Sequence, residues 1–172
     1  MKIIVMLFLS ILFGWADTLY FLPFEASKAK TQLLRWIDQA SYSIDIAMYS
    51  FTNRQIAKHL KNAAKRGVQI RLLVDYDQNS KDRYAQIGYL AKYKHINVYT
   101  IRGISAKHGN YYGKMHIKLA IIDSKRLIFG SANWSNSAFR RNYELIYFLE
   151  EYTKAKKAKR YFERMVRKAQ EY

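Results

Sequence analysis

The sequence contains no cysteine and few acidic residues. Without cysteine, neither disulfide bonds nor thiolate zinc sites can form, and redox chemistry does not indicate a cellular compartment. Thirteen Asp and Glu face thirty Lys and Arg, which gives a formal net charge of +17 at pH 7. So many positive charges repel one another within a fold. We therefore expect them to serve to attract a polyanion such as nucleic acid or an anionic membrane.

The chain also lacks internal repeats, low-complexity linkers and a long hydrophobic run. The apolar stretch over residues 3–16 is shorter than the roughly 20 residues that a transmembrane helix needs. Lys2 precedes it and Asp17 follows it, which predicts a secretory signal peptide over residues 1–16, cleaved after Ala16. An uncleaved membrane anchor is the alternative. Either segment predicts export, with residues 17–172 in the periplasm or membrane-associated outside the cytoplasm.

Alternating helix and strand patterns predict the fold class of residues 17–172. Helices are expected over 24–40, between Thr52 and Gly67, over 81–94 and from 151 to the end, with Thr52 and Gln55 as a capping box. Strands are expected over 43–51, 68–76, 96–101, 116–123, 126–133 and 142–150. The expected fold is one α/β domain, a mixed β-sheet flanked by helices on both faces.

The segment over residues 102–115 interrupts this alternation. It carries three glycines and no apolar period, which predicts a loop that leads directly into His116. Its cationic and aromatic side chains, with the nearby Trp134, could contact phosphates and stack on bases. The expected substrate-binding residues are Lys107, Tyr111, Tyr112, Lys114 and Trp134. A solvated surface loop is the alternative for this segment.

The predicted strand over 116–123 carries two polar side chains on one face. Because side chains alternate along a strand, His116 and Lys118 point to one side, and Ile117, Leu119 and Ile121 are expected to point into the core. An imidazole beside a fixed positive charge is more than stability requires, which indicates a chemical role.

A longer motif begins at this strand. Its residues are His116, Lys118, Asp123, Ser131, Asn133 and, further along, Glu144. This spacing resembles the HKD motif of the phospholipase D superfamily with its GSxN extension, and "SIDIAMYSFTN" resembles the first core strand of that family. A single HKD copy in a short basic chain is most similar to the bacterial Nuc-type endonucleases. The resemblance implies the phospholipase D/nuclease-like fold, and phosphodiester hydrolysis with no metal and no other cofactor.

The chemistry of a phosphodiester fits these residues. Attack on this anion needs a nucleophile and neutralisation of charge. His116 is expected to attack phosphorus and form a phosphohistidine, while Lys118 holds a non-bridging oxygen. Ser131 and Asn133 would donate hydrogen bonds to the phosphate, and Glu144 would bind the second imidazole nitrogen of His116. Asp123 is an odd number of residues from His116 and Lys118, so on a strand its side chain would point to the opposite face. The resemblance implies a structural supporting role for it near the strand end.

The number of motifs predicts the assembly. The mechanism that the resemblance implies uses two histidines on opposite sides of the phosphorus, and this chain has one HKD motif. A C2 homodimer that contributes His116 from each subunit to one shared site is therefore expected.

Several functions remain open from the sequence. The favoured one is DNA hydrolysis without sequence specificity, with single strands preferred because exposed bases can stack, and with RNA as an alternative nucleic acid. A phospholipid or cardiolipin hydrolase would use the same chemistry, and a surface DNA-binding protein would use only the charge. A metal-dependent nuclease built on Asp75 and Asp77 is the weakest alternative.

Overall fold

Strands and helices alternate along most of the chain in the computed structural model, which describes residues 17–109 and 111–172. The strands are β1 (Thr18–Leu22), β2 (Ser43–Met48), β3 (Gln69–Asp75), β4 (Ile96–Ile101), β5 (Lys118–Ile122), β6 (Arg126–Gly130), β7 (Glu144–Glu150) and β8 (Gln170–Glu171). The helices are α1 (Ala26–Asp38), α2 (Arg54–Lys65), α3 (Tyr76–Asn79), α4 (Ile87–Leu90), α5 (Asn136–Arg140) and α6 (Tyr152–Val166). The predicted signal peptide or anchor over residues 1–16 lies outside the described residues.

All eight strands form one mixed sheet in the order β1-β7-β6-β5-β2-β3-β4-β8. Strands β2, β3 and β4 are parallel, and the remaining pairs are antiparallel. As a result, one edge of the sheet holds the ends of β2, β3, β4 and β6 and the beginnings of β5 and β7. We call this the C-edge. In open α/β sheets, functional groups gather beside the carboxyl ends of the parallel strands.

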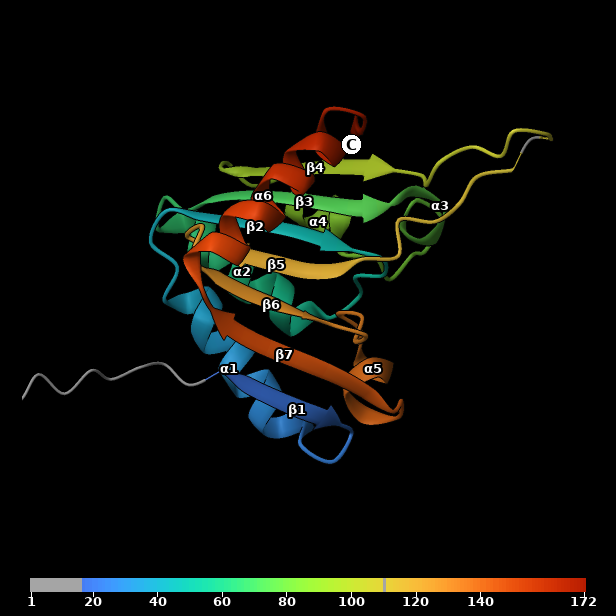
Figure 1. The fold of residues 1–172 in the computed structure, drawn as a ribbon. Coiled ribbons are helices and arrows are strands. Elements are labelled where there is room, and N and C mark those ends of the chain that lie inside the picture. Colours follow the sequence, from blue (N-terminus) through green and yellow to red (C-terminus); the bar gives the residue numbers. More distant parts are fainter. Residues whose placement is uncertain (1–16, 110) are drawn as a thin grey trace, which may run out of the picture.

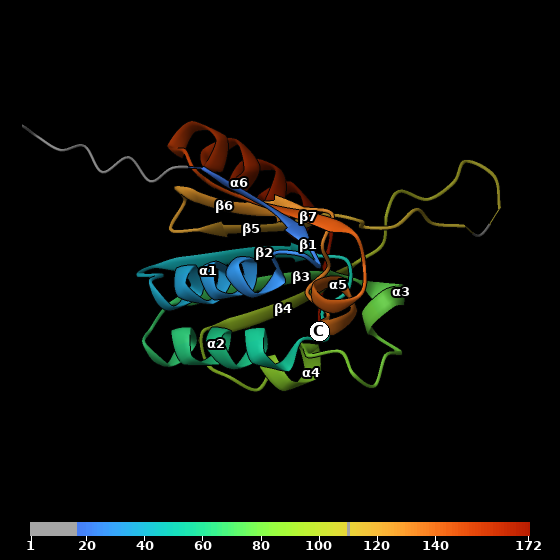
Figure 2. The same cartoon turned by 90° about the horizontal axis from the view of Figure 1, so that it is seen from below.

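Helices cover both faces of the sheet, which confirms the predicted fold class. Helices α1 and α2 lie on one face, where Leu33, Ile37, Ile56 and Leu60 are fully buried, and α6 lies on the other (Figure 2). Phe162 of α6 is also fully buried, in a second cluster that includes Ala47, Leu73 and Ile121 of the sheet. Among the described residues, no helix is long and apolar enough to cross a membrane.

A partly buried ionic network fixes α6 to the sheet. Arg71 of β3 donates from Nε to Asp45 of β2 at 2.7 Å, and its two terminal nitrogens donate to Glu163 of α6 at 2.8 and 3.1 Å. Asp45 is only 2 % exposed, and Lys159 of α6 lies 3.8 Å from its second oxygen. Asp45 therefore links β2 to the neighbouring strand β3 and to α6.

Part of the face that carries α6 is not covered by a helix. In Figure 1, α6 crosses the upper strands on the near face, while β7 and β1 have no helix in front of them. The strand register aligns Leu119, Phe129, Tyr147 and Leu19 across four strands, with Leu145 and Phe21 as the next pair. The side chains of Leu19, Phe21, Ile117, Phe129 and Leu145 are between 38 and 53 % exposed. We call these five residues the uncovered face.

Several predicted elements differ from the structure. The helix expected over 81–94 is reduced to the single turn of α4, because residues 80–86 have no apolar face to bury. Helix α2 is capped by Asn53, whose side chain accepts from the N–H groups of Gln55 and Ile56, and not by Thr52. Strands β1 and β8 and the short helix α5 were not predicted.

Candidate active site

All the motif residues except Asp123 lie at the C-edge, where antiparallel strands bring distant segments together. Strand β5 begins at Lys118, so His116 and Ile117 precede it, although the Tyr49 N–H still donates to the Ile117 carbonyl at 3.0 Å. The expected placement of the apolar residues is therefore correct only in part. Ile121 is buried, but Ile117 is 40 % exposed, because at the strand end no helix packs over it.

His116 is exposed and lies against an aromatic ring that the motif does not include. Its ring centroid is 4.5 Å from that of Tyr49, the residue that follows β2, at an interplanar angle of 56°. Within the described residues, no hydrogen bond to the His116 imidazole occurs. Tyr49 therefore limits how the imidazole can turn and leaves both nitrogens accessible to a substrate.

Two lysines complete the positive surroundings of His116. The Lys118 ammonium donates to the His116 carbonyl at 2.8 Å and lies 4.9 Å from the Tyr49 ring centroid. Lys114 lies 5.8 Å from the same centroid. Burial lowers the pKa of the Lys118 ammonium, and the nearby Glu144 carboxylate opposes that shift only in part. A partly desolvated cation of this kind attracts an anion more strongly than a solvated one does.

Asn133 has a free amide nitrogen at the C-edge, because only its amide oxygen is bound within the described residues. The oxygen accepts from the Ser50 N–H at 3.2 Å, in the segment that follows β2. The NH₂ group is then the part of the side chain available to donate to a phosphate. Ser131 and Asn133 both lie past the end of β6 at Gly130, so their placement comes from this segment and not from strand alternation.

The prediction that Trp134 stacks on bases is wrong. Its side chain is 1 % exposed and packs edge-to-face against Phe51, with ring centroids 5.4 Å apart. Its carbonyl accepts from the N–H groups of Thr52 and Asn53. Trp134 is therefore a core anchor that holds the neighbouring Asn133 in place.

Glu144 has a different partner from the one expected. Its carboxylate accepts hydrogen bonds from the Ser131 hydroxyl and from the Asn142 side-chain amide, and no bond to His116 occurs in the part of the chain described. The sheet order explains the difference, because β6 and Ser131 lie between β7, where Glu144 begins the strand, and β5, which follows His116. The Ser131 hydroxyl also accepts from the Leu145 N–H at 3.1 Å.

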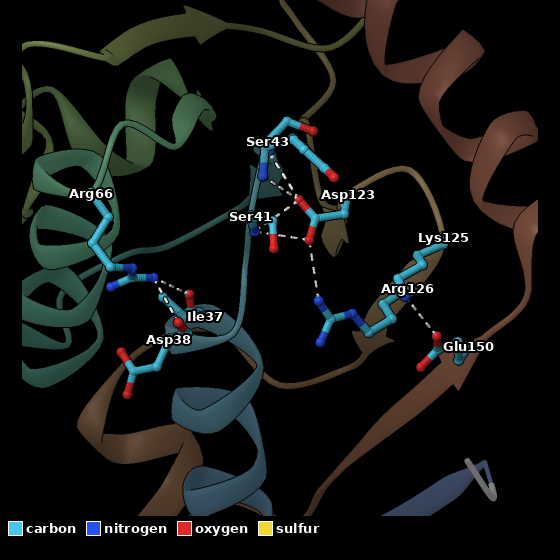
Figure 3. Close-up of polar contacts among 10 residues, drawn as sticks. Ile37, Asp38, Ser41, Ser43, Arg66, Asp123, Lys125, Arg126 and Glu150 are labelled. Atoms are coloured by element: carbon cyan, nitrogen blue, oxygen red, sulfur yellow. Dashed lines mark hydrogen bonds and ion pairs between the residues drawn. The ribbon is translucent and has the colours of Figure 1, made fainter. Parts of the chain in front are cut away.

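Asp123 lies at the opposite end of β5, remote from His116. Figure 3 shows its carboxylate facing Ser41, Ser43 and Arg126. It accepts from the backbone N–H groups of residues 41, 42 and 43 at 2.8 to 3.2 Å and from Arg126 at 3.2 Å. Burial raises the pKa of this carboxyl, but these donors lower it by more, so that the net shift is downward. The contacts fit the predicted supporting role.

Residues 102–109 and 111–115 form the two sides of a narrow hairpin that projects from the C-edge (Figure 1), and we call these two segments the arm. Gly103 and Gly113 allow its two sides to approach, since a Cβ on Gly103 would lie 2.4 Å from the Gly113 carbonyl carbon. Tyr111 and Tyr112 are 68 % and 49 % exposed, and the predicted contact residues Lys107 and Lys114 are exposed as well. The arm therefore presents four of the five expected substrate-binding side chains to solvent.

Two hollows open on either side of the arm. One, of about 830 Å³, lies between the arm and α6 and is lined by Met115, His116, Ile117, Arg164 and Lys168 among others. The other, of about 650 Å³, lies between the arm and α3 and reaches Tyr49. The motif analysis missed Tyr49, Arg102 and Arg164, because none of them belongs to the HKD spacing. The position of Tyr49 at the end of a parallel strand is the signal that could have indicated it.

The aspartates at 75 and 77 are engaged by protein donors. Asp75 is buried and accepts from the backbone N–H groups of Gln78 and Met115, and Asp77 pairs with Arg102. In residues 17–109 and 111–172, no group of three or more His, Cys, Asp or Glu side chains is placed to hold a metal ion.

Comparison with known proteins places the chain in a family. Residues 33–166 match the family model "Cardiolipin synthase, PLD-like domain". Among curated relatives, a mitochondrial cardiolipin hydrolase of Mus musculus is 32 % identical over 121 residues, 70 % of this chain and 50 % of that protein. A phospholipase D of Rickettsia prowazekii is 32 % identical over 120 residues, 69 % of this chain and 53 % of that protein. The chain thus spans about half the length of the curated relatives it matches.

Solved structures agree. NucT from Helicobacter pylori superposes with a TM-score of 0.88 at 40 % identity, covering 91 % of this chain and 99 % of that one. Nuc from Salmonella typhimurium, a phospholipase D family member, superposes with a TM-score of 0.75 at 25 % identity over 91 % of this chain and 97 % of its own. The motif, the sheet and these matches show that the chain belongs to the phospholipase D superfamily, with the fold of the Nuc proteins.

Proposed function

We propose that this protein is a metal-independent phosphodiesterase that hydrolyses DNA without sequence specificity, with single strands preferred. The observation that carries the proposal is the environment of His116. Its imidazole is exposed at the C-edge without a hydrogen-bond partner among the described residues. Lys118 and Lys114 lie around the Tyr49 ring that packs against it, and Asn133 has its amide nitrogen free at the same edge. These groups supply a nucleophile, two cations and a donor, which together suit an anionic phosphodiester.

The proposed reaction has two displacement steps. An unprotonated imidazole nitrogen of His116 attacks phosphorus, the bond to the leaving oxygen breaks, and that oxygen takes a proton from His116 of the partner subunit. Water then gives a proton back to that second imidazole and attacks the phosphohistidine, which releases the phosphate end and the free His116. Lys118 and Asn133 offset the charge on the non-bridging oxygens throughout.

The uncovered face supports the proposed homodimer. One chain carries one HKD motif, so the second histidine must come from a second copy. Ile117 of the uncovered face directly follows His116, and the face extends from there across β6 and β7 to β1. Contiguous exposed apolar side chains of this kind are typical of an interface. Pairing two such faces about a two-fold axis that passes near His116 would bring the two imidazoles together.

A lipid phosphodiesterase is the second candidate. The curated relatives include mitochondrial cardiolipin hydrolases, and the hollow between the arm and α6 has apolar lining from Met115, Ile117 and Met165. A non-catalytic DNA-binding protein would need only the net charge. We also propose that the protein works outside the cytoplasm, on the basis of the apolar segment over residues 3–16.

The test is parallel digestion of single-stranded DNA, duplex DNA, RNA and cardiolipin vesicles, each with and without EDTA. The proposal expects single-stranded DNA to be cut fastest and EDTA to leave the rate unchanged. Turnover of cardiolipin alone would favour the lipid candidate, and binding without turnover would favour the non-catalytic one. Loss of activity in EDTA that Mg²⁺ restores would exclude the phosphohistidine route.

A further inference from the structure

The hollow between the arm and α3 adjoins the candidate active site through Tyr49. This aromatic ring lies against His116 and beside Lys118, and it also lines the hollow, together with Gln78, Arg102, Tyr111, Tyr112 and Lys114. A ligand in the hollow would therefore be the immediate neighbour of a group that reacts at His116.

One wall of this hollow is a flat cation that is held in place without any ligand. The Arg102 guanidinium lies 3.9 Å from the ring centroid of Tyr76 and 5.6 Å from that of Tyr112. Its Nε and one terminal nitrogen donate to the two carboxylate oxygens of Asp77 at 2.9 and 3.0 Å. Because Asp77 offsets its charge, Arg102 is better suited to present a stacking surface than to bind a phosphate.

The remaining walls suit a heteroaromatic ring with polar edges. Tyr111 and Tyr112 expose large parts of their rings, and Lys114 supplies a cation between the hollow and His116. The Gln78 side-chain amide has no hydrogen-bond partner within the described residues, so it can both donate to and accept from a base edge. About 650 Å³ is within the usual range for a small-molecule pocket of roughly 300–1,000 Å³ and leaves room for one nucleoside.

We propose that this hollow is a subsite for one unstacked nucleobase, that of the nucleotide next to the scissile phosphate. This proposal rests on the proposed nuclease function, and it locates the preference for single strands in this hollow. Arg102 and Tyr112 form the stacking surface, Gln78 contacts the base edge, and Lys114, which lines both hollows, binds the scissile phosphate. A paired base cannot enter without leaving its helix, which makes duplex DNA the poorer substrate.

The experiment places a single abasic tetrahydrofuran residue in single-stranded oligonucleotides and maps every cut on a sequencing gel. We expect the wild-type rate to fall at one phosphate only, which adjoins the abasic position always on the same side. The fall should be about tenfold, because the stacking of one base is lost. In Arg102→Ala and Tyr112→Ala, intact DNA should be cut about tenfold more slowly and the abasic position should cause no further loss.

Two variants separate the causes. Arg102→Lys keeps the charge but loses the planar surface, so it should behave like Arg102→Ala. Arg83→Ala is the matched control, because Arg83 also lies over a tyrosine ring, Tyr84 at 4.7 Å, but lines neither hollow. It should leave rate and pattern unchanged. A wild-type protein that cuts intact DNA, and that cuts the abasic oligonucleotide equally at all phosphates around the abasic residue, would refute the subsite. Failure to cut intact DNA at all would instead refute the proposed function.

Discussion

At the residue scale, the chemistry depends on which atoms are already bound. His116 has no hydrogen-bonded partner in the described chain, Asn133 has its oxygen occupied, and Asp123 is saturated by donors far from the C-edge. The three residues belong to one motif, yet their different surroundings fit three different proposed roles, which are attack, donation and structural support. Each assignment predicts a different result on substitution.

Replacing His116 by Asn should abolish hydrolysis by more than about 10³-fold, because the nucleophile is lost. Binding to DNA should persist, since the non-specific affinity comes from the basic surface. The control is His95→Asn. His95 has a φ of 70°, a backbone conformation that Asn tolerates, and it lies at the opposite end of the sheet from the C-edge. Near-normal turnover by the His116 variant, measured beside its binding isotherm, would place the reaction elsewhere.

Asn133→Asp should be at least as inactive as Asn133→Ala. The aspartate retains an oxygen for the Ser50 N–H, so folding is preserved, but it replaces the amide donor with a negative charge that repels phosphate. Thermal melts should show Tm values close to that of the wild type, while kcat/KM falls about 10²-fold or more. If the aspartate variant is more active than the alanine variant, Asn133 does not donate to the substrate.

Asp123→Asn should destabilise the protein without changing the chemistry. Asn fits the backbone at φ 51°, but it loses the charge that faces three N–H donors and Arg126. The free energy of unfolding should fall by about 2–3 kcal/mol in urea titrations. At a temperature where the variant is folded, its turnover and pH profile should match the wild type. A changed pH profile would instead indicate a part in proton transfer.

At the element scale, the sheet assembles the site and α6 covers one half of one face. The C-edge receives the ends or beginnings of β2, β3, β5, β6 and β7, which bring residues from positions 49 to 144 together. Helix α6 is fixed by Phe162 and by the ion pairs of Arg71. These ion pairs make the stability of α6 docking depend on pH.

The Glu163 carboxylate should stabilise the fold above pH 5 and lose this contribution as the pH falls. Hydrogen bonds from Arg71 lower its pKa below the usual value of about 4.3. A lowered folded-state pKa means that the stabilisation is present above the unfolded pKa and disappears as the pH falls through the folded one. Solvent screening limits it to about 1 kcal/mol.

Urea titrations of Glu163→Gln should therefore show a smaller deficit against wild type at pH 3 than at pH 7. Glu171→Gln on β8 removes the same charge without touching Arg71, and it serves as the control. An equal deficit at both pH values would show that the ion pair contributes nothing to the pH dependence.

At the scale of the whole molecule, the net charge fits the proposed polyanionic substrate and the uncovered face fits the proposed homodimer. A net charge of +17 favours binding to nucleic acid at low salt, and the uncovered face offers the apolar contact that a second copy could bury. The groups that the proposed reaction needs are complete only if two copies meet at His116.

If the proposed homodimer forms through the uncovered face, Leu19→Glu should convert it to a monomer and reduce activity in parallel. Leu19 is 43 % exposed on β1 and lies on the uncovered face, several strands away from His116. A buried, unpaired carboxylate at the interface opposes association. Sedimentation velocity and initial rates on single-stranded DNA, measured at the same concentrations, give the two readouts. Tyr42→Glu is the control, because Tyr42 is 75 % exposed in the turn before β2, outside the uncovered face.

Co-refolding provides a second readout for the same prediction. Wild-type chains refolded with excess His116→Asn chains should form mixed dimers with one histidine, so that activity falls below simple dilution. Activity that follows the wild-type fraction linearly, from a species of monomer mass, would contradict a shared site.

The sequence by itself determined the fold class, the family and the motif, because these depend on local patterns. Alternating hydrophobicity specified the central strands and α1, α2 and α6, and the HKD spacing identified His116, Lys118 and Asn133. The sequence could not specify contacts between distant segments. Trp134 reads as an exposed aromatic beside a polar turn, and only its packing on Phe51 makes it part of the core. Glu144 reads as a partner for His116, and only the strand order places Ser131 between them. Tyr49 and Arg102 carry no motif, and they reach the site because parallel strands end at the same edge, a consequence of pairing that no local pattern encodes.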